Sequence, residues 1–171
     1  MKKISCVLGA AVLVFFVVSG AVAAESWSSL NRQVIEMYQK KYYTKAIPTA
    51  QKALDVAESQ YGSDAPETAL ALNNLAMLYK KTKRYKAAEP LYKRALAISE
   101  KKVGPNHPDL AVPLNNLAMF YESQKDYKRS DTLSLRAISI LKKTYGDPHP
   151  YAVQARERYQ KMKLARPAGT S

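Results

Sequence analysis

Few side chains in this sequence could carry out catalysis or hold a metal ion. The only histidines, His107 and His149, each precede a proline and lie 42 residues apart. No cysteine stands near them, and a zinc site needs several ligands at close spacing. No serine or cysteine is flanked by glycines as a nucleophile would be, and no glycine-rich loop could hold a phosphate. The sequence therefore predicts a protein that is not an enzyme and that uses no metal and no cofactor.

Two asparagine pairs offer a different chemistry, which is the capture of a peptide backbone. The segment from Leu72 to Met77 reads Leu-Asn-Asn-Leu-Ala-Met, and the same six residues recur from Leu114 to Met119. An asparagine side chain both donates and accepts hydrogen bonds, so it can pair with an extended peptide whatever the peptide's own side chains are. The methionine that closes each segment adds a deformable apolar contact.

The 42-residue offset continues through most of the chain and defines the elements that must position these asparagines. It relates Tyr85 to Tyr127 and Gly104 to Gly146, and a less regular earlier copy precedes them. Within one copy, apolar residues follow the helical period twice, with a break around residues 81–84. Each copy therefore predicts a pair of helices, and its glycine marks the end of the second helix.

The predicted fold class is all-α, an α-α superhelix of three helix pairs plus a C-terminal capping helix. The domain is expected over residues 25–165, with repeats at about 26–67, 68–109 and 110–151. A fourth copy lacks the asparagine pair and is crowded with charge, so residues 150–165 predict a capping helix with a polar outer face. Residues 166–171 are expected to be a disordered tail.

These residues resemble the tetratricopeptide repeat, whose pattern combines apolar, small and aromatic positions on two helices. The 42-residue length and the segments 88–92 and 104–108 look like the kinesin light chain type. The resemblance covers about residues 30–150. The residues that match the pattern are Leu72, Leu75, Ala76, Tyr79, Ala88 and Tyr92. Gln33, Ser130 and Ser134 depart from it, so the outer copies should pack less tightly than the middle one.

The resemblance implies that the first helices line the inner wall of the superhelix and contact bound peptides there. On a helical wheel, each asparagine pair lies opposite the side that faces the partner helix. An alternative is that one asparagine of each pair bonds to the neighbouring helix and only orders the stack. The expected partner-binding groove contains Asn31, Asn73, Asn74, Met77, Lys81, Asn115, Asn116 and Met119.

The chain is also strongly basic, with 27 Lys and Arg against 14 Asp and Glu and a formal net charge of +13. A basic patch is expected at the break between the helices of the middle copy, and a second lies near the C-terminus. Such patches attract acidic proteins, anionic lipid or nucleic acid, or they simply keep a protein soluble. The first patch consists of Lys80, Lys83, Arg84 and Lys86 beside Lys81.

The first 24 residues are expected to be a cleavable signal peptide. Lys2 and Lys3 precede an apolar stretch, and small residues before Glu25 allow cleavage after Ala23 or Ala24. The alternative is an uncleaved membrane anchor, because about 20 apolar residues can span a bilayer. A leader of this kind looks bacterial and indicates the periplasm, although a secretory route in another cell type would use a similar one.

The sequence as a whole predicts an exported, non-enzymatic adaptor that binds a protein or peptide, with an acidic partner favoured by the charge. No small-molecule substrate is expected. One alternative is a membrane-associated scaffold, held by the uncleaved leader or by the basic patches. Another is a basic repeat protein that binds nucleic acid, although no glycine-aromatic RNA-binding signature accompanies the lysines.

Overall fold

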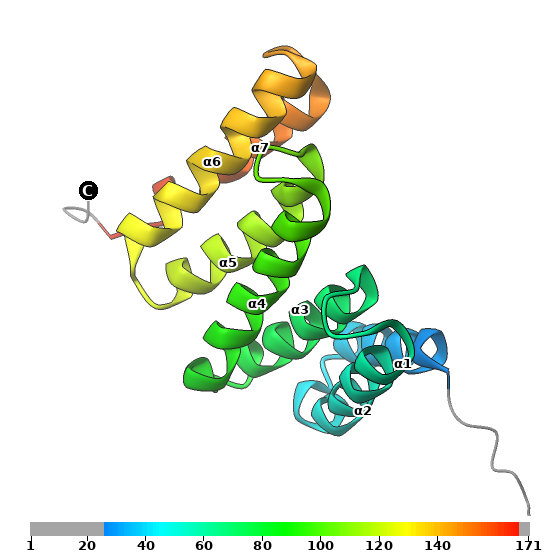
Figure 1. Cartoon of the computed structure of the whole chain (residues 1–171). Coiled ribbons are helices and arrows are strands. Elements are labelled where there is room, and N and C mark those ends of the chain that lie inside the picture. Colours follow the sequence, from blue (N-terminus) through cyan, green and yellow to red (C-terminus); the bar gives the residue numbers. More distant parts are fainter. Residues whose placement is uncertain (1–25, 168–171) are drawn as a thin grey trace, which may run out of the picture.

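The computed structural model describes residues 26–167, and this part of the chain folds into seven α-helices and a short 3-10 helix. Consecutive helices pack against each other as antiparallel pairs and stack into a curved solenoid (Figure 1). The elements are α1 (Trp27–Gln39), α2 (Tyr43–Tyr61), α3 (Pro66–Lys81), α4 (Tyr85–Val103), η1 (Pro108–Leu110), α5 (Ala111–Ser123), α6 (Tyr127–Tyr145) and α7 (Pro150–Leu164). The predicted all-α architecture of three helix pairs and a capping helix is confirmed. The expected signal peptide lies outside the described residues.

The turns inside the helix pairs share one conformation at the end of the first helix. Lys41, Lys83 and Lys125 adopt a left-handed backbone with φ of 61°, 60° and 60°. In the first of these turns, the backbone N–H of Lys41 donates to the carbonyl of Tyr38 and that of Tyr42 donates to the carbonyl of Met37. This pair of bonds is the Schellman motif, which satisfies carbonyls that the helix leaves free.

The loops between the pairs end the second helices differently. Gly62, Gly104 and Gly146 follow these helices with φ of 94°, 87° and 88°, and their ψ values are 162°, 159° and 163°. Residues with a side chain do not adopt this conformation readily, so glycine is required. Each loop then leads into a helix that begins at or near a proline, as the sequence predicts.

The core consists of two neighbouring clusters of buried side chains. One joins the first and middle pairs and includes Leu72 and Leu75, and the other joins the middle and last pairs and includes Tyr92 and Phe120. Tyr79 and Leu91 contact both clusters. Because each pair packs only on its neighbours, the core extends along the stack.

The capping helix is held to the last pair by Arg166, which lies just past its end. The Arg166 guanidinium donates to both carboxylate oxygens of Glu122, at 2.9 Å and 2.8 Å, and to both of Asp131, at 3.2 Å and 2.6 Å. It also lies over the Tyr127 ring, 4.6 Å from the centroid. Only 6% of the Arg166 side chain is exposed. The expected disordered tail therefore begins with an anchored residue, and residues 168–171 lie outside the described range.

Within residues 26–167, no helix combines the length and the apolar composition that crossing a bilayer requires.

Candidate peptide-binding groove

The expected groove residues lie on one face of α1, α3 and α5, which are the first helices of the three pairs. Apolar side chains at repeat-equivalent positions form two exposed rows on this face. Ile35 and Met119 are 45% and 44% exposed, with the partly buried Met77 between them. Leu70 and Val112 form the second row and are 43% and 66% exposed. Solvent-facing apolar rows of this kind are typical of a binding surface.

An asparagine ladder runs between the two rows. The Asn74 side-chain Nδ2 donates to Asn31 Oδ1 at 2.7 Å, and Asn116 Nδ2 donates to Asn73 Oδ1 at 3.2 Å. Each bond joins the second asparagine of one copy to the first asparagine position of the preceding copy. Asn74 and Asn116 thus hold adjacent first helices together, as the stack-ordering alternative describes.

The asparagine ladder stops at Asn115. In the next copy, the position equivalent to Asn116 is Arg158 of α7. Neither Asn115 nor Arg158 makes a side-chain hydrogen bond or an ion pair within residues 26–167, and both line the same hollow. An amide and a guanidinium that are free at one site can together bind a carbonyl or a carboxylate.

This hollow is the C-terminal pocket, a cavity of about 290 Å³ between α5 and α7. Its outer wall is aromatic, because Tyr145 and Tyr151 line it and are 41% and 58% exposed. The two rings meet edge to face at 5.6 Å, and the His149 ring stacks on Tyr145 at 4.7 Å. An exposed aromatic wall provides a large rigid contact area for a partner.

A second cavity, the middle pocket, lies one repeat earlier between α3 and α5 and has a volume of about 390 Å³. Its lining is mostly apolar and includes Leu70, Ile98 and Val112, with Asn73 at its side. Many lining positions of the two pockets are equivalent in the 42-residue register. The matched residues are Pro66 and Pro108, Ala69 and Ala111, Leu70 and Val112, Asn73 and Asn115, and Val103 and Tyr145. The repeat therefore builds the same kind of pocket twice and equips the two pockets differently.

The residues of the predicted basic patch fall into two groups in the structure. Lys80, Lys81 and Lys83 line a hollow that Met119 shares, so they lie at the other end of the groove wall. Burial lowers the pKa of Lys80, and the neighbouring Lys81 lowers it further. The Lys81 ammonium lies over the Tyr38 and Tyr43 rings, at 5.9 Å and 5.7 Å from their centroids. Arg84 and Lys86 are exposed and do not line this hollow.

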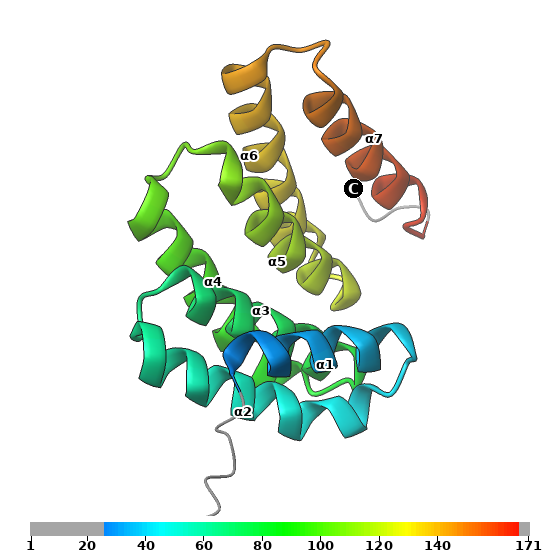
Figure 2. The same ribbon diagram turned by 90° about the vertical axis from the view of Figure 1, so that its right-hand side faces the viewer.

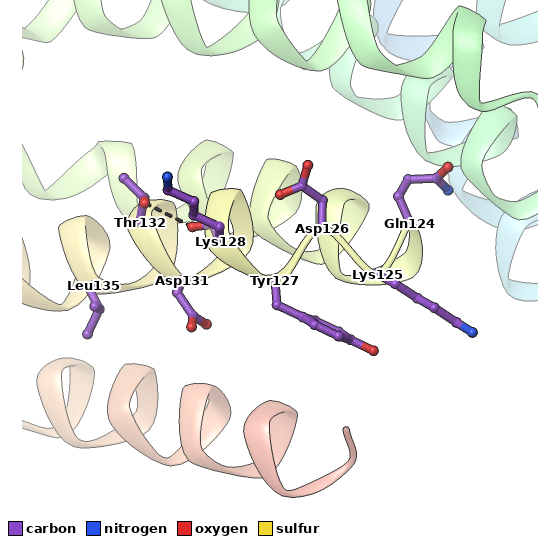
Figure 3. A pocket seen from close by; sticks show the side chains of 8 residues that line it. All are labelled: Gln124, Lys125, Asp126, Tyr127, Lys128, Asp131, Thr132 and Leu135. Carbon is purple, nitrogen blue, oxygen red and sulfur yellow. Dashed lines mark hydrogen bonds between the residues drawn. The ribbon is translucent and has the colours of Figure 1, made fainter. Parts of the chain in front are cut away.

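One further hollow is not a convergent site. It has about 810 Å³ and follows the α5–α6 turn and the start of α6. Figure 3 shows that Tyr127 and Asp131 point toward one side of this helix, whereas Lys128 and Thr132 point toward the other. Side chains that diverge in this way cannot surround a ligand.

The two histidines cap the helices that follow them. The Nδ1 atom of His107 accepts from the backbone N–H of Asp109, and that of His149 accepts from Tyr151, both at 3.3 Å. Within residues 26–167, no group of three His, Cys, Asp or Glu side chains has the arrangement of a metal site.

Three residues of the C-terminal pocket were not predicted from the sequence. Tyr145 and Tyr151 flank a loop, and Arg158 lies in the basic stretch near the C-terminus. The available signal was the repeat register, which puts Arg158 in the place of Asn116 and Tyr145 in the place of Val103.

Comparisons with known proteins agree with this geometry. The sequence profile of the tetratricopeptide repeat family matches residues 29–101 and 76–143. No match by sequence was found among curated proteins. A crystal structure of the nearly identical TPR-like repeats of a kinesin light chain from Podosopora anserina matches with a TM-score of 0.70 and 18% identity, over 81% of this chain and 65% of that one.

A second solved structure, BtubC (BKLC) from P. vanneervenii, matches with a TM-score of 0.63 and 21% identity, over 81% of this chain and 63% of that one. The chain thus spans less than two thirds of the length of either structure, and the likeness is one of fold. Tetratricopeptide repeats generally form non-enzymatic scaffolds that bind proteins. On the profile match over two overlapping ranges, the chain belongs to the tetratricopeptide repeat family, and its stacked helix pairs resemble those of the kinesin light chain repeats in fold.

Proposed function

We propose that this protein is a non-enzymatic adaptor that binds an extended peptide segment of a partner protein along the groove formed by α1, α3 and α5. The middle pocket takes an apolar side chain of the peptide. The C-terminal pocket takes a neighbouring residue whose carbonyl or carboxylate meets Asn115 and Arg158. The proposal rests on one observation above all, the pair of repeat-equivalent pockets with a free amide and a free guanidinium at the second.

An extended peptide fits the spacing of these pockets. Packed helices lie about 8–10 Å apart, and an extended chain advances about 3.3 Å per residue. Pockets between successive first helices are therefore separated by about three residues of an extended peptide. The partner's charge is expected to be negative on balance, since Arg158 in the C-terminal pocket has no ion-pair partner among residues 26–167.

Site-specific photo-crosslinking in the native cell tests the location of binding. A photoreactive residue at Val112, which lines both pockets, should give a discrete adduct. The matched control is Leu135 of α6, which is also apolar and is 51% exposed, against 66% for Val112, but lines neither pocket. Equal crosslinking from the two positions would contradict the groove.

The asparagine ladder supplies a second test of the same proposal. Asn115→Ala should weaken binding of the crosslinked peptide roughly fivefold, for the loss of about 1 kcal/mol of hydrogen bonding, and leave the melting temperature unchanged. Asn116→Ala removes a bond between helices and should instead lower the stability. Titration calorimetry and thermal melting of both variants measure these effects, and unchanged affinity of Asn115→Ala would contradict the role of the free amide.

We also propose that the adaptor acts outside the cytoplasm of a bacterial cell, after removal of residues 1–24. The support is the charged start, apolar stretch and alanine-rich end of that segment. Mass spectrometry of the protein from its native cell should find a mature chain that starts at Ala24 or Glu25. An intact Met1 would instead favour the membrane-anchored alternative.

A further inference from the structure

One edge of the solenoid carries most of the basic residues that lie between helices. The α1–α2, α3–α4 and α5–α6 turns gather at this edge, and the loops that join successive pairs lie at the opposite edge (Figure 2). The turns, residues 40–42, 82–84 and 124–126, contain five basic residues and one acidic residue. The opposite loops, residues 62–65, 104–107 and 146–149, contain two aspartates and neither lysine nor arginine. The basic edge consists of Lys40, Lys41, Lys83, Arg84 and Lys125.

The backbone of these turns does not call for lysine. Lys41, Lys83 and Lys125 occupy the left-handed position of the Schellman motif, which glycine favours. A lysine at this position has a higher backbone energy than a glycine would have, and it adds a positive charge. A cation near the helix end does complement the helix dipole, but any position in the last turn would serve that purpose. The presence of lysine at this position in all three turns therefore indicates that its charge serves binding rather than stability.

The basic edge is also not neutralised from within. None of its five residues makes an ion pair in the described part of the chain. Asp126, the one acid in the turns, is held by Arg129, whose Nε lies 2.7 Å from it, and Glu122 is held by Arg166. All five basic residues are exposed, and Figure 3 shows Lys125 extending away from the helices. At the opposite edge, by contrast, Asp64 and Asp147 each pair with a lysine.

We infer that the basic edge docks the protein on a membrane surface that contains anionic phospholipid. The charges lie on three successive turns, about 10 Å apart for packed helices, so the partner must present negative charge across the width of the stack. A bilayer surface does this at every point, and each lysine near it contributes to binding. Two exposed apolar side chains flank the charges and could enter the headgroup layer: Tyr42, 53% exposed, and Leu164 at the end of α7, 87% exposed.

Vesicle co-sedimentation of the mature chain tests this inference. The protein should bind vesicles of phosphatidylcholine and phosphatidylglycerol, should not bind phosphatidylcholine alone, and should be released by added salt. The variant Lys41→Gln/Lys83→Gln/Lys125→Gln should bind the anionic vesicles about a hundredfold more weakly, because each lysine contributes about fivefold. Its matched control, Lys101→Gln/Lys142→Gln/Lys143→Gln, removes the same charge from exposed lysines near the opposite edge and should bind like the wild type.

A third variant separates loss of vesicle binding from loss of the fold. Replacing Lys41, Lys83 and Lys125 by glycine relieves the left-handed backbone, so this protein should melt at a higher temperature than the wild type and still lose vesicle binding.

Three results would overturn the inference. One is equal weakening by the two triple glutamine variants, because net charge alone would then explain binding. Another is the absence of binding to anionic vesicles. The third is binding of double-stranded DNA at lower concentration than vesicles with the same dependence on the basic edge, which would identify a nucleic acid as the partner. The inference does not rest on the peptide groove, so Asn115→Ala should leave vesicle binding unchanged.

Discussion

Tyr92 carries a buried polar group that makes no hydrogen bond within residues 26–167. The residue lies in α4 with 1% of its surface exposed, and the polar group is its hydroxyl. Burial raises the pKa of this hydroxyl above its usual value of 10. The ring itself packs well, with its centroid 5.6 Å from that of Phe120. The favourable part of the side chain is therefore the ring, and the hydroxyl is buried without compensation.

Tyr92→Phe is expected to stabilise the protein. It keeps the ring contact and removes a buried polar group without a partner, which should raise the free energy of unfolding by about 1 kcal/mol. Urea unfolding followed by circular dichroism measures this change. The matched control is Tyr121→Phe, since the Tyr121 hydroxyl donates to Glu89 at 2.9 Å and its loss should lower the stability. A lower stability of Tyr92→Phe would show that its hydroxyl has a partner, such as a water molecule.

At the residue scale, the sequence predicted where the asparagines lie but not what each one does. The helical wheel places both members of a pair on the inner wall. Which member is free depends on the residue that faces it from the next copy, and for Asn115 that residue is Arg158. A single-copy pattern contains no information about this neighbour, so the difference between Asn115 and Asn73 became visible only in the stacked structure.

The capping helix α7 illustrates how one contact secures an element. In the earlier pairs, the first helix packs against a second helix that follows it, and within the described chain α7 has no such partner. Most of its exposed positions are polar, as the sequence predicts for the end of a solenoid. The ion pairs of Arg166 with Glu122 and Asp131 tie its end to α5 and α6. A residue expected in a disordered tail thus fixes the end of the stack, because its partners come from helices more than 30 residues earlier.

Arg166→Ala is expected to destabilise the protein by about 2–3 kcal/mol, since it leaves two mostly buried carboxylates without their cation. Hydrogen bonding from Arg166 lowers the pKa of Asp131. A carboxyl with a lowered pKa stabilises the fold above its unfolded value, about 3.9, and this contribution is lost as the pH falls through the folded pKa. The difference between wild type and variant should therefore be constant near neutral pH and shrink below about pH 4.

Thermal unfolding of both proteins between pH 3 and pH 7 checks this prediction over the range where Asp131 titrates. Arg158→Ala, which removes an exposed arginine of the preceding helix α7, is the control and should change the stability by less than about 0.5 kcal/mol. A gap between wild type and Arg166→Ala that does not depend on pH would contradict the role of Asp131.

For the whole molecule, the repeat period carried most of the predictive information. It fixed the number of helix pairs, their ends and the inner wall, because each pair packs only on its neighbours and local pattern therefore determines the global stack. The cavities between pairs were not predictable in the same way. They depend on the volumes of residues from three helices at once, such as Leu70, Ile98 and Val112 in the middle pocket.

Both ends of the stack also depart from the pattern for a physical reason. Gln33 occupies the position equivalent to Leu75, which is buried against the first pair. Within the described chain no pair precedes α1, so Gln33 remains exposed. Ser130 and Ser134, which replace Ala88 and Tyr92, are nevertheless fully or almost fully buried, and the Ser130 hydroxyl lies 3.8 Å from the Met162 sulfur of α7. Ser130 of the last pair thus lies beneath the capping helix.

The two hydrogen bonds between asparagine side chains of the first helices run in the same direction, each donated by a later copy to an earlier one. The inner wall is consequently directional. Its two ends differ chemically, and within residues 26–167 only the end near α7 has an asparagine whose side chain makes no hydrogen bond, beside an arginine. An extended peptide bound as proposed would meet different groups when reversed, so one direction along the groove should be preferred.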